Sequence, residues 1–234
     1  MNLNKGIMET LTILRTGPLG VNTYIVPLAG DAVYVVDPAA CALSGDETKI
    51  TAWLKEHKKE PRAIVLTHGH FDHILGLPIL KRAYPACPIV VHKDDACLLG
   101  GASAQIESLR LMGIEAIARA LCDMPPCDIS FSGGETLGEI IPCEDDGVRA
   151  SLSKWKTVHT PGHTPGSVCL YSAARNELIS GDTIFYRSCG RTDLPGGDER
   201  TMYASLALIE KEIPHETLVY PGHDYCGFPL SENY

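Results

Sequence analysis

Short apolar runs recur along the first half of the chain, and each is followed by a turn or a polar loop. Four of these runs predict strands, over residues 22–26, 32–37, 62–67 and 88–92. The second run is nearly continuous in apolar residues, which is typical of a strand that is buried on both faces. After it, apolar residues at helical spacing predict a helix that is capped by Ser44 or Asp46 and ends at Lys58.

The pattern becomes helical over residues 94–121, with breaks at Gly100 and Gly113, and two prolines end it. We therefore expect a helical insertion at about residues 94–127. Its apolar positions should pack into the core, and the insertion can overhang a site as a lid. Two further helices are expected, over residues 74–83 and 199–212.

Composition indicates one globular domain over residues 1–234, because 44% hydrophobic content is enough for one substantial core. The net charge of −9, from 29 acidic and 20 basic residues, argues against a nucleic-acid partner. We expect neither a membrane span nor an export signal, since residues 1–9 lack an apolar core. Nine scattered cysteines without a C-x-x-C pair are typical of reduced thiols, so a cytoplasmic location is expected.

The segment THGHFDH at residues 67–73 carries the most informative chemistry. It places three of the nine histidines and one carboxylate within seven residues. Imidazole nitrogens and carboxylate oxygens suit a borderline divalent cation such as zinc. The alternation along the loop leaves ligands facing two ways, so that one loop can serve two metals. Surface histidines at a strand end are the less favoured explanation, because a third of all histidines gather here.

Three later segments place a further ligand type after an apolar run. His163 lies in a Pro-Gly-His turn, Asp182 follows Gly181 after a strand-like run, and His223 ends a second Pro-Gly-His turn. We expect these side chains to gather at one edge of a sheet, where loops carry function on a rigid scaffold. Seven nitrogen and oxygen ligands indicate an open, catalytic site, since closed structural zinc sites usually have four ligands and often thiolates.

These four motifs, in this order, resemble the metallo-β-lactamase superfamily over about residues 17–227. Within it, Gly-Asp-Thr-Ile-Phe at residues 181–185 and Gly-Arg-Thr-Asp at residues 190–193 are similar to the glyoxalase II group of thioester hydrolases. The resemblance implies an α/β fold, a four-layer αβ/βα sandwich of two mixed β-sheets flanked by helices.

The resemblance also implies roles for single residues. One metal would bind His68, His70 and His163, the other would bind Asp72, His73 and His223, and Asp182 would bridge them. Two divalent ions are expected, Zn²⁺ first, with Fe or Mn as alternatives. Asp37 matches an aspartate that supports a ligand histidine. Arg191 and Asp193 either contact each other and shape their own loop, or Arg191 binds carboxylates that support the ligands or belong to the substrate.

This arrangement suits the hydrolysis of a thioester. A metal-bridging hydroxide, available because metal binding lowers the pKa of water to about 7, is expected to attack the carbonyl, with Asp72 and Asp182 taking part in catalysis. A thiolate, with a reference pKa of about 8.5, leaves with little help from an acid. The glyoxalase II resemblance implies a glutathione-linked substrate such as an S-lactoyl conjugate. No basic cluster for glutathione follows the last Pro-Gly-His turn, so the reaction is indicated more strongly than the carrier.

A second function uses the same residues. Persulfide dioxygenases resemble the chain at residues 188–193 and 223–228, and they bind one iron at positions that match His68, His163 and Asp182. The hydrolase is favoured because residues 181–185 and 194–197 look more like the thioesterase group. A secreted β-lactamase and a nuclease rank lower, since the chain shows neither an export signal nor a net positive charge.

Overall fold

The computed structural model describes residues 9–100, 105–111 and 113–233. Residues 1–8, on which the expected absence of an export signal depends, lie outside the described residues. The first sheet contains β1 (Thr12–Thr16), β2 (Val21–Pro27), β3 (Ala32–Val36), β4 (Glu60–Val65), β5 (Ile89–His92) and β6 (Ile129–Phe131), paired in that order. Its first two pairings are antiparallel and its last three are parallel, so the sheet is mixed.

The second sheet is built from the other half of the chain. Its strands are β7 (Lys156–His159), β8 (Val168–Ser172), β9 (Glu177–Gly181), β12 (Leu218–Pro221) and β13 (Phe228–Pro229), in the order β13-β12-β9-β8-β7. Only β9 and β12 pair in parallel, so this sheet is mixed as well. A separate hairpin consists of β10 (Ile184–Phe185) and β11 (Ser188–Cys189).

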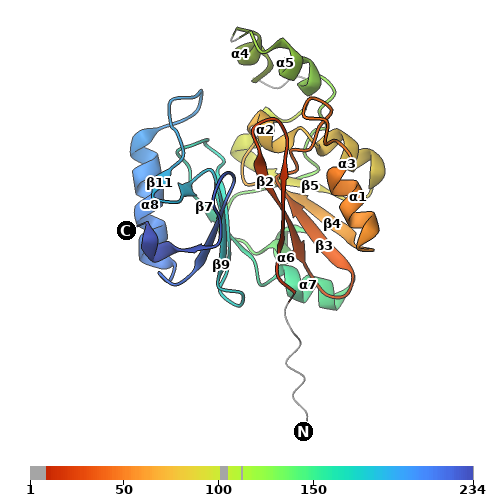
Figure 1. The fold of residues 1–234 in the computed structure, drawn as a ribbon. Helices are drawn as coiled ribbons and strands as arrows, with labels where there is room; N and C mark the ends of the chain where they lie inside the picture. The colour runs from red at the N-terminus through yellow and green to blue at the C-terminus, as the bar shows by residue number, and fades with distance from the viewer. Residues whose placement is uncertain (1–8, 101–104, 112, 234) are drawn as a thin grey trace.

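Helices connect and cover the strands. They are α1 (Lys49–Glu56), α2 (Phe71–Ile74), α3 (Leu77–Ala83), the 3-10 helix η1 (Lys93–Leu98), α4 (Gln105–Leu111), α5 (Glu115–Leu121), α6 (Leu137–Ile140), α7 (Asp146–Leu152), α8 (Glu199–Glu212) and the 3-10 helix η2 (Leu230–Glu232). The expected helical insertion corresponds to η1, α4 and α5, and the last two lie at the top of the molecule in Figure 1. Among the described helices, none has both the length and the apolar character needed to cross a bilayer.

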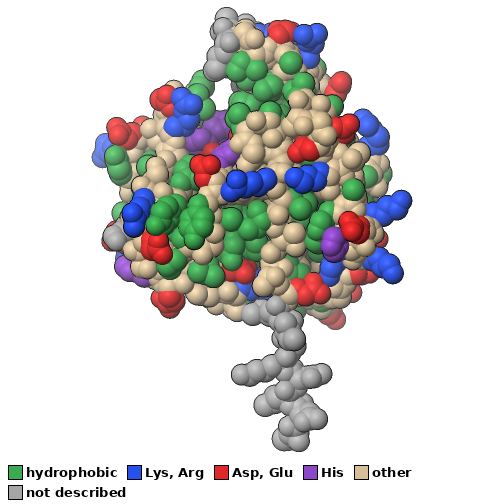
Figure 2. All heavy atoms as spheres, viewed as in Figure 1, with side chains coloured by type: hydrophobic (Ala, Val, Ile, Leu, Met, Phe, Trp, Pro, Cys, Tyr) green, Lys and Arg blue, Asp and Glu red, His purple; other side chains and the backbone are tan. Residues whose placement is uncertain are grey.

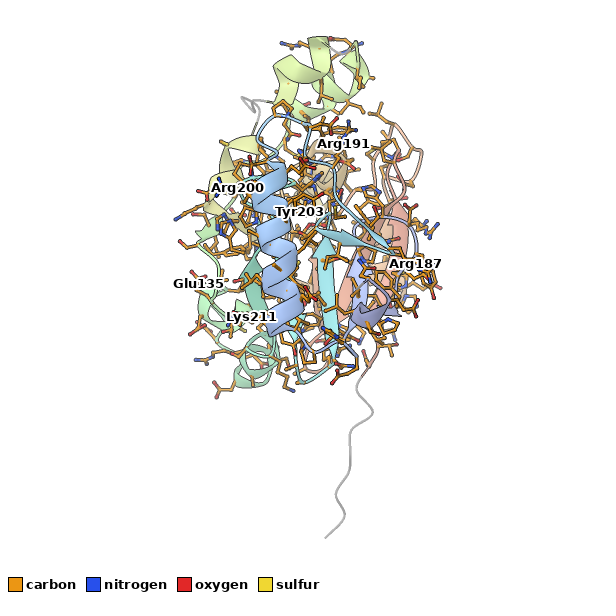
Figure 3. All side chains as sticks on the ribbon, turned by 90° about the vertical axis from the view of Figure 1, so that its left-hand side faces the viewer. Glu135, Arg187, Arg191, Arg200, Tyr203 and Lys211 are labelled. Atoms are coloured by element: carbon orange, nitrogen blue, oxygen red, sulfur yellow. The ribbon has the colours of Figure 1, made fainter. Side chains whose placement is uncertain are left out.

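The alternation of side chains along β3 shows how the layers pack. Val33 and Val35 face a core that they share with α1 and α3, whereas Tyr34 and Val36 face a core between the two sheets. On the far side of the second sheet, α8 packs through Ile209. It faces the viewer in Figure 3, with Tyr203 on its exposed side. The layers therefore run helix, sheet, sheet, helix (Figure 1), which is the expected α/β sandwich.

Two expectations about helix ends are wrong. The first helix begins at Lys49, because the Asp46 carboxylate accepts hydrogen bonds from Cys41 N and Gly17 N at 2.9 Å each and so fixes a turn instead of capping a helix. The helix expected over residues 74–83 begins only at Leu77, as α3, because Ile74 ends α2 and the helix is interrupted at Gly76. Its amide donates to Pro38 O at 2.8 Å, so the backbone there is tied to the segment after β3.

Candidate metal centre

The expected ligand residues lie together at one edge of the sandwich, because each follows the end of a strand there. His68 and His70 follow β4, His163 follows β7, Asp182 follows β9, and His223 follows β12. Histidine side chains line a hollow in the upper part of Figure 2. The structure thus brings together residues from both sheets and both halves of the chain.

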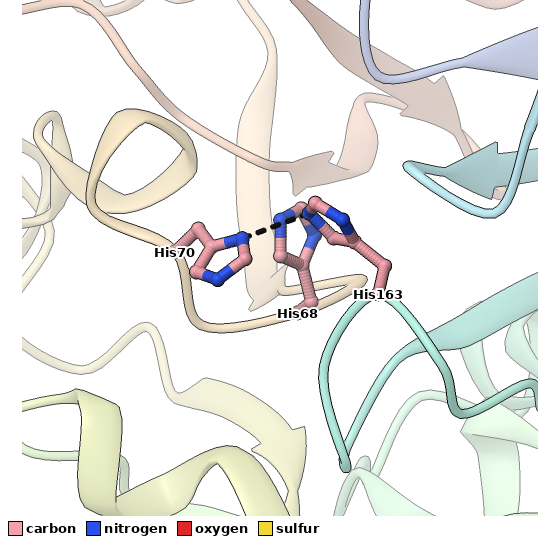
Figure 4. A group of neighbouring side chains, drawn as sticks. All are labelled: His68, His70 and His163. Atoms are coloured by element: carbon pink, nitrogen blue, oxygen red, sulfur yellow. Dashed lines mark hydrogen bonds between the residues drawn. The ribbon is translucent and has the colours of Figure 1, made fainter. Parts of the chain in front are cut away.

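His68, His70 and His163 form the first group. One ring nitrogen of each lies within 4.8 Å of the others, and His70 Nδ1 is 2.8 Å from His163 Nε2 (Figure 4). His68 and His163 are buried, with exposed fractions of 1% and 3%. Three imidazole nitrogens at this spacing suit one shared cation such as Zn²⁺.

Asp72, His73 and His223 form the second group. His223 Nε2 lies 3.2 Å from Asp72 Oδ2 and 3.2 Å from His73 Nε2. His73 Nε2 is 3.6 Å from the same Asp72 oxygen. Two nitrogens and one oxygen therefore converge on a second point beside the first group.

The carboxylate of Asp182 lies between the two groups. Its Oδ1 is 3.4 Å from His73 Nε2, and its Oδ2 is 3.5 Å from His163 Nε2. Space for this side chain depends on Gly222, because a Cβ at that position would overlap Asp182 Oδ1. The second Pro-Gly-His turn thus supplies a histidine to the site and leaves room for the aspartate that joins the groups.

The second ring nitrogen of four of these histidines contacts an oxygen. His73 Nδ1 lies 3.0 Å from Asp37 Oδ2, and Asp37 is itself fixed by the amide and hydroxyl of Thr67. His163 Nδ1 lies 2.8 Å from the carbonyl oxygen of Arg191. Weaker contacts join His68 Nδ1 to Thr67 Oγ1 and His223 Nδ1 to Leu19 O. Such contacts orient metal-binding histidines and leave Nε2 free to face a cation.

The electrostatics of the first group and of Asp72 favour the protonation states that bind cations. Burial and neighbouring imidazoles hold the pKa of His68 well below its usual range, and burial lowers the pKa of His70 to about 4. Burial opposes ionisation of Asp72, but His73 and His223 keep its pKa well below its usual range. His68, His70 and Asp72 can therefore coordinate a metal without first losing protons. Burial opposes protonation of His73 and His223, but the carboxylates of Asp72 and Asp182 raise the pKa of both, so these two rings lose a proton when they bind a metal.

Two buried polar atoms at this site lack a hydrogen-bond partner among the described residues. They are His68 Nε2 and Asp182 Oδ1, one in the first group and one in the carboxylate between the groups. Buried polar atoms normally have partners, and a divalent cation provides one for each of these. All the candidate donor atoms are nitrogens or oxygens, and such donors suit Zn²⁺, Fe²⁺ or Mn²⁺.

Arg191 forms the contact within its loop that was one of its two expected roles. Its Nε and one terminal nitrogen bond both oxygens of Asp193 at 2.7 and 2.8 Å, and both side chains are mostly exposed. This pairing lowers the pKa of Asp193 to about 2 through the hydrogen bonds from Arg191. Arg191 also touches the site through its carbonyl oxygen, near one end of α8 in Figure 3.

No sequence pattern indicated Asp95, which connects two of the ligand loops. This fully buried carboxylate accepts hydrogen bonds from Gly69 N at 2.8 Å, Gly166 N at 2.7 Å and Thr164 Oγ1 at 2.7 Å. A Cβ at Gly166 would lie 2.6 Å from Asp95 Oδ1, so glycine is needed for this approach. Gly69 separates His68 from His70, and Thr164 follows His163. Asp95 therefore fixes the positions of the two loops that carry the three histidines of the first group.

Replacing Asp95 with Asn should weaken metal binding by about tenfold or more, the effect expected when a partner of ligand residues is lost. The amide NH₂ must face either Gly69 N–H or Gly166 N–H, so one loop loses its acceptor. Chelator competition on the purified protein measures the affinity. The control is Asp128→Asn, which makes the same change in a carboxylate that accepts from Ile89 N and Lys81 Nζ away from the ligand loops. An Asp95→Asn affinity equal to that of the control would contradict this role.

Gln105 is a second residue that sequence patterns did not reveal. Its Oε1 accepts from Phe71 N at 2.8 Å, and its Nε2 donates to Gly69 O at 2.8 Å and to Leu98 O at 3.0 Å. The side chain of α4 thus ties the insertion to the ligand loop. A polar residue in a helical pattern gives no local signal for such a contact.

A separate group of His92, Asp94 and His159 does not form a comparable site. The two imidazoles stack with ring centroids 4.1 Å apart and planes within 17° of parallel. A cation lies near the ring plane of each histidine that binds it, and two stacked parallel rings share no such plane. The Nε2 atoms contact Ser132 O and Pro165 O, which suits a packed pair.

Comparison with known proteins places this architecture in a family. Residues 16–223 match the model of the metallo-β-lactamase superfamily. The probable metallo-hydrolase YqgX of Bacillus subtilis is 33% identical over 90% of this chain and 88% of its own length. The human mitochondrial persulfide dioxygenase ETHE1 is 30% identical over 71% of this chain, which corresponds to 50% of that protein.

Solved structures agree with the fold. The BLEG-1 B3 metallo-β-lactamase superposes with a TM-score of 0.78 and 28% identity, covering 95% of each chain. TTHA1623, crystallised in a di-iron-bound form, has a TM-score of 0.75 and 30% identity, covering 94% of this chain and 96% of its own. The two ligand groups and this di-iron relative indicate a site for two metals. The chain belongs to the metallo-β-lactamase superfamily.

Proposed function

We propose that this protein is a two-metal hydrolase of thioesters and that glutathione is the thiol carrier. The observation that carries the proposal is the position of Asp182, within 3.5 Å of nitrogens in both histidine groups. A carboxylate so placed can contact two cations at once. Paired cations are typical of hydrolases that activate water between them.

The metal ligands are assigned from the two groups. His68, His70 and His163 hold one ion, Asp72, His73 and His223 hold the other, and Asp182 contacts both. Asp37 supports His73 through the 3.0 Å contact to its Nδ1. Zn²⁺ is the ion we assign first, and Fe and Mn suit the same donors.

The residues of the chain position the reactants. When bound, two divalent cations supply an activated water near neutral pH and stabilise the charge that builds on the carbonyl oxygen. Asp72 is ionised and lines the cavity, so its carboxylate can orient that water by accepting a hydrogen bond. A thiolate with a reference pKa of about 8.5 leaves unaided, so the neutral rings of His68 and His70 need not donate a proton.

The alternative is an iron-dependent persulfide dioxygenase. The observation in its favour is the 30% identity to the human enzyme over 167 residues. One iron held by two histidines and one carboxylate would need only His68, His163 and Asp182. The complete second group of Asp72, His73 and His223 favours the hydrolase, because its three ligand atoms converge on a position for a second cation.

Release of free thiol from S-lactoylglutathione tests the proposal. We expect metal-replete protein to hydrolyse this thioester and chelation to abolish the activity, because the nucleophile depends on the bound ions. The same samples are given glutathione persulfide in an oxygen electrode. Oxygen uptake without thioester hydrolysis would refute the proposed hydrolase and support the dioxygenase.

A further inference from the structure

A cavity of about 650 Å³ opens beside the two ligand groups. His70, Asp72, His163, Asp182 and His223 all contribute to its lining, so a substrate in the cavity reaches the metal centre. Its volume is in the range of pockets that hold small molecules. The other side chains that line it decide which substrates fit.

Most of those side chains are apolar. Leu98, Leu109 and Ile114 come from the insertion. Phe71 begins α2, Phe185 ends β10 and Leu194 lies in a loop, so both halves of the sandwich contribute. Ile114 is 37% exposed although it is a large hydrophobic residue. Exposed apolar side chains around a cavity mark a surface that binds apolar groups.

Two polar side chains of the described lining, those of Gln105 and Arg191, are already engaged. The amide of Gln105 bonds Phe71 N, Gly69 O and Leu98 O. The guanidinium of Arg191 is paired with both oxygens of Asp193. Asp224 also lines the cavity and would repel a second carboxylate. A hydroxyl on an acyl group that packs against Leu98, Leu109 and Ile114 would therefore lose its hydration without gaining a strong partner.

We propose that this cavity selects thioesters with an apolar acyl group, such as a short alkanoyl chain, over hydroxyacyl thioesters of equal length. The inference rests on the proposed thioester hydrolysis and narrows its substrate class. The acyl chain lies against Leu98, Leu109 and Ile114, and the polar carrier extends to the exposed side, where Arg191 lies. The S-lactoyl conjugate is then a slower substrate than its propanoyl counterpart.

Two matched comparisons test this class with one carrier. The first is kcat/KM for S-acetyl-, S-butanoyl- and S-hexanoylglutathione, which should rise on the order of tenfold or more across the series, because each fully buried methylene contributes about fourfold. The second compares S-propanoyl- with S-lactoylglutathione, each rate divided by its rate of hydrolysis by hydroxide alone. A flat series, or a faster lactoyl conjugate, would overturn the inference.

A matched pair of variants locates the effect. Ile114→Ser should reduce the preference for hexanoyl over acetyl by about fourfold or more, since it removes apolar contact from the cavity wall. Ile13→Ser is the control, because Ile13 is also 37% exposed but lies on β1 and does not line the cavity. An equal preference for hexanoyl over acetyl in both variants would show that the insertion does not contribute to the acyl site.

Binding of S-alkylglutathiones separates failure of the inference from failure of the proposed function, because these thioethers have no bond to hydrolyse. Calorimetry on the metal-loaded protein should show S-hexylglutathione binding on the order of tenfold more tightly than S-methylglutathione. Tighter binding without hydrolysis of any thioester would refute the hydrolase and keep the apolar site. Equal affinities would refute the apolar site, whatever the hydrolysis assay shows.

Discussion

Asp182→Ala is expected to remove both metals and thioester hydrolysis together. The Asp182 carboxylate lies between the two histidine groups, 3.4 Å from His73 Nε2 and 3.5 Å from His163 Nε2. Its loss leaves five imidazoles close together with less negative charge to hold two dications. The rate should fall by more than the roughly 10- to 100-fold that follows loss of an indirect partner of a metal. Metal content per chain and thiol release are measured on the same preparation.

Asp145→Ala is the control for this variant. Asp145 caps α7 through Val148 N at 3.0 Å, so its loss weakens a helix end without touching the site. We expect this control to keep two metals and most of the activity, with a lower melting temperature. Two metals per chain in Asp182→Ala would defeat the assignment of Asp182 as the shared ligand.

His73→Ala should lower the metal content from two to about one per chain and reduce thioester hydrolysis by roughly 10- to 100-fold. The His73 ring is fully buried, with Nδ1 on Asp37 and Nε2 facing Asp182, Asp72 and His223. Burial opposes protonation of His73, but the Asp182 and Asp72 carboxylates still raise its pKa well above the usual range. That position therefore attracts positive charge, as a cation site should.

The same variant separates the two candidate functions. In a one-iron dioxygenase that uses His68, His163 and Asp182, His73 does not contact the metal. The metal content should then be one per chain both before and after the substitution. His73→Gln retains a polar side chain of similar size, so a change common to both variants does not come from the space left by Ala. Unchanged metal content with unchanged hydrolysis would show that Asp72, His73 and His223 hold no ion.

Local patterns predicted much of the framework. The helix over residues 199–212 is correct at both ends, because its apolar periodicity follows a capping residue, and Asp198 accepts from Thr201 N. The strand at residues 32–36 is buried as its continuous apolar run indicated. The first helix started later than predicted because Asp46 is used by a turn whose partner, Gly17, lies 29 positions away. Such a competitor leaves no trace in the local sequence.

By itself, the sequence determined which side chains can bind metal and where along the chain they occur, because a ligand after a strand and a tight turn is a local pattern. Only the tertiary structure decided which ligands meet. His70 and His163 are 93 positions apart, and His73 and His223 are 150 apart, so their contacts depend on how the two sheets pack. The same holds for Asp95, whose partners Gly69 and Gly166 come from opposite sheets. The apolar cavity is likewise lined by segments that are far apart in the chain. The hydrophobic effect favours covering an apolar side chain but does not specify which segment covers it.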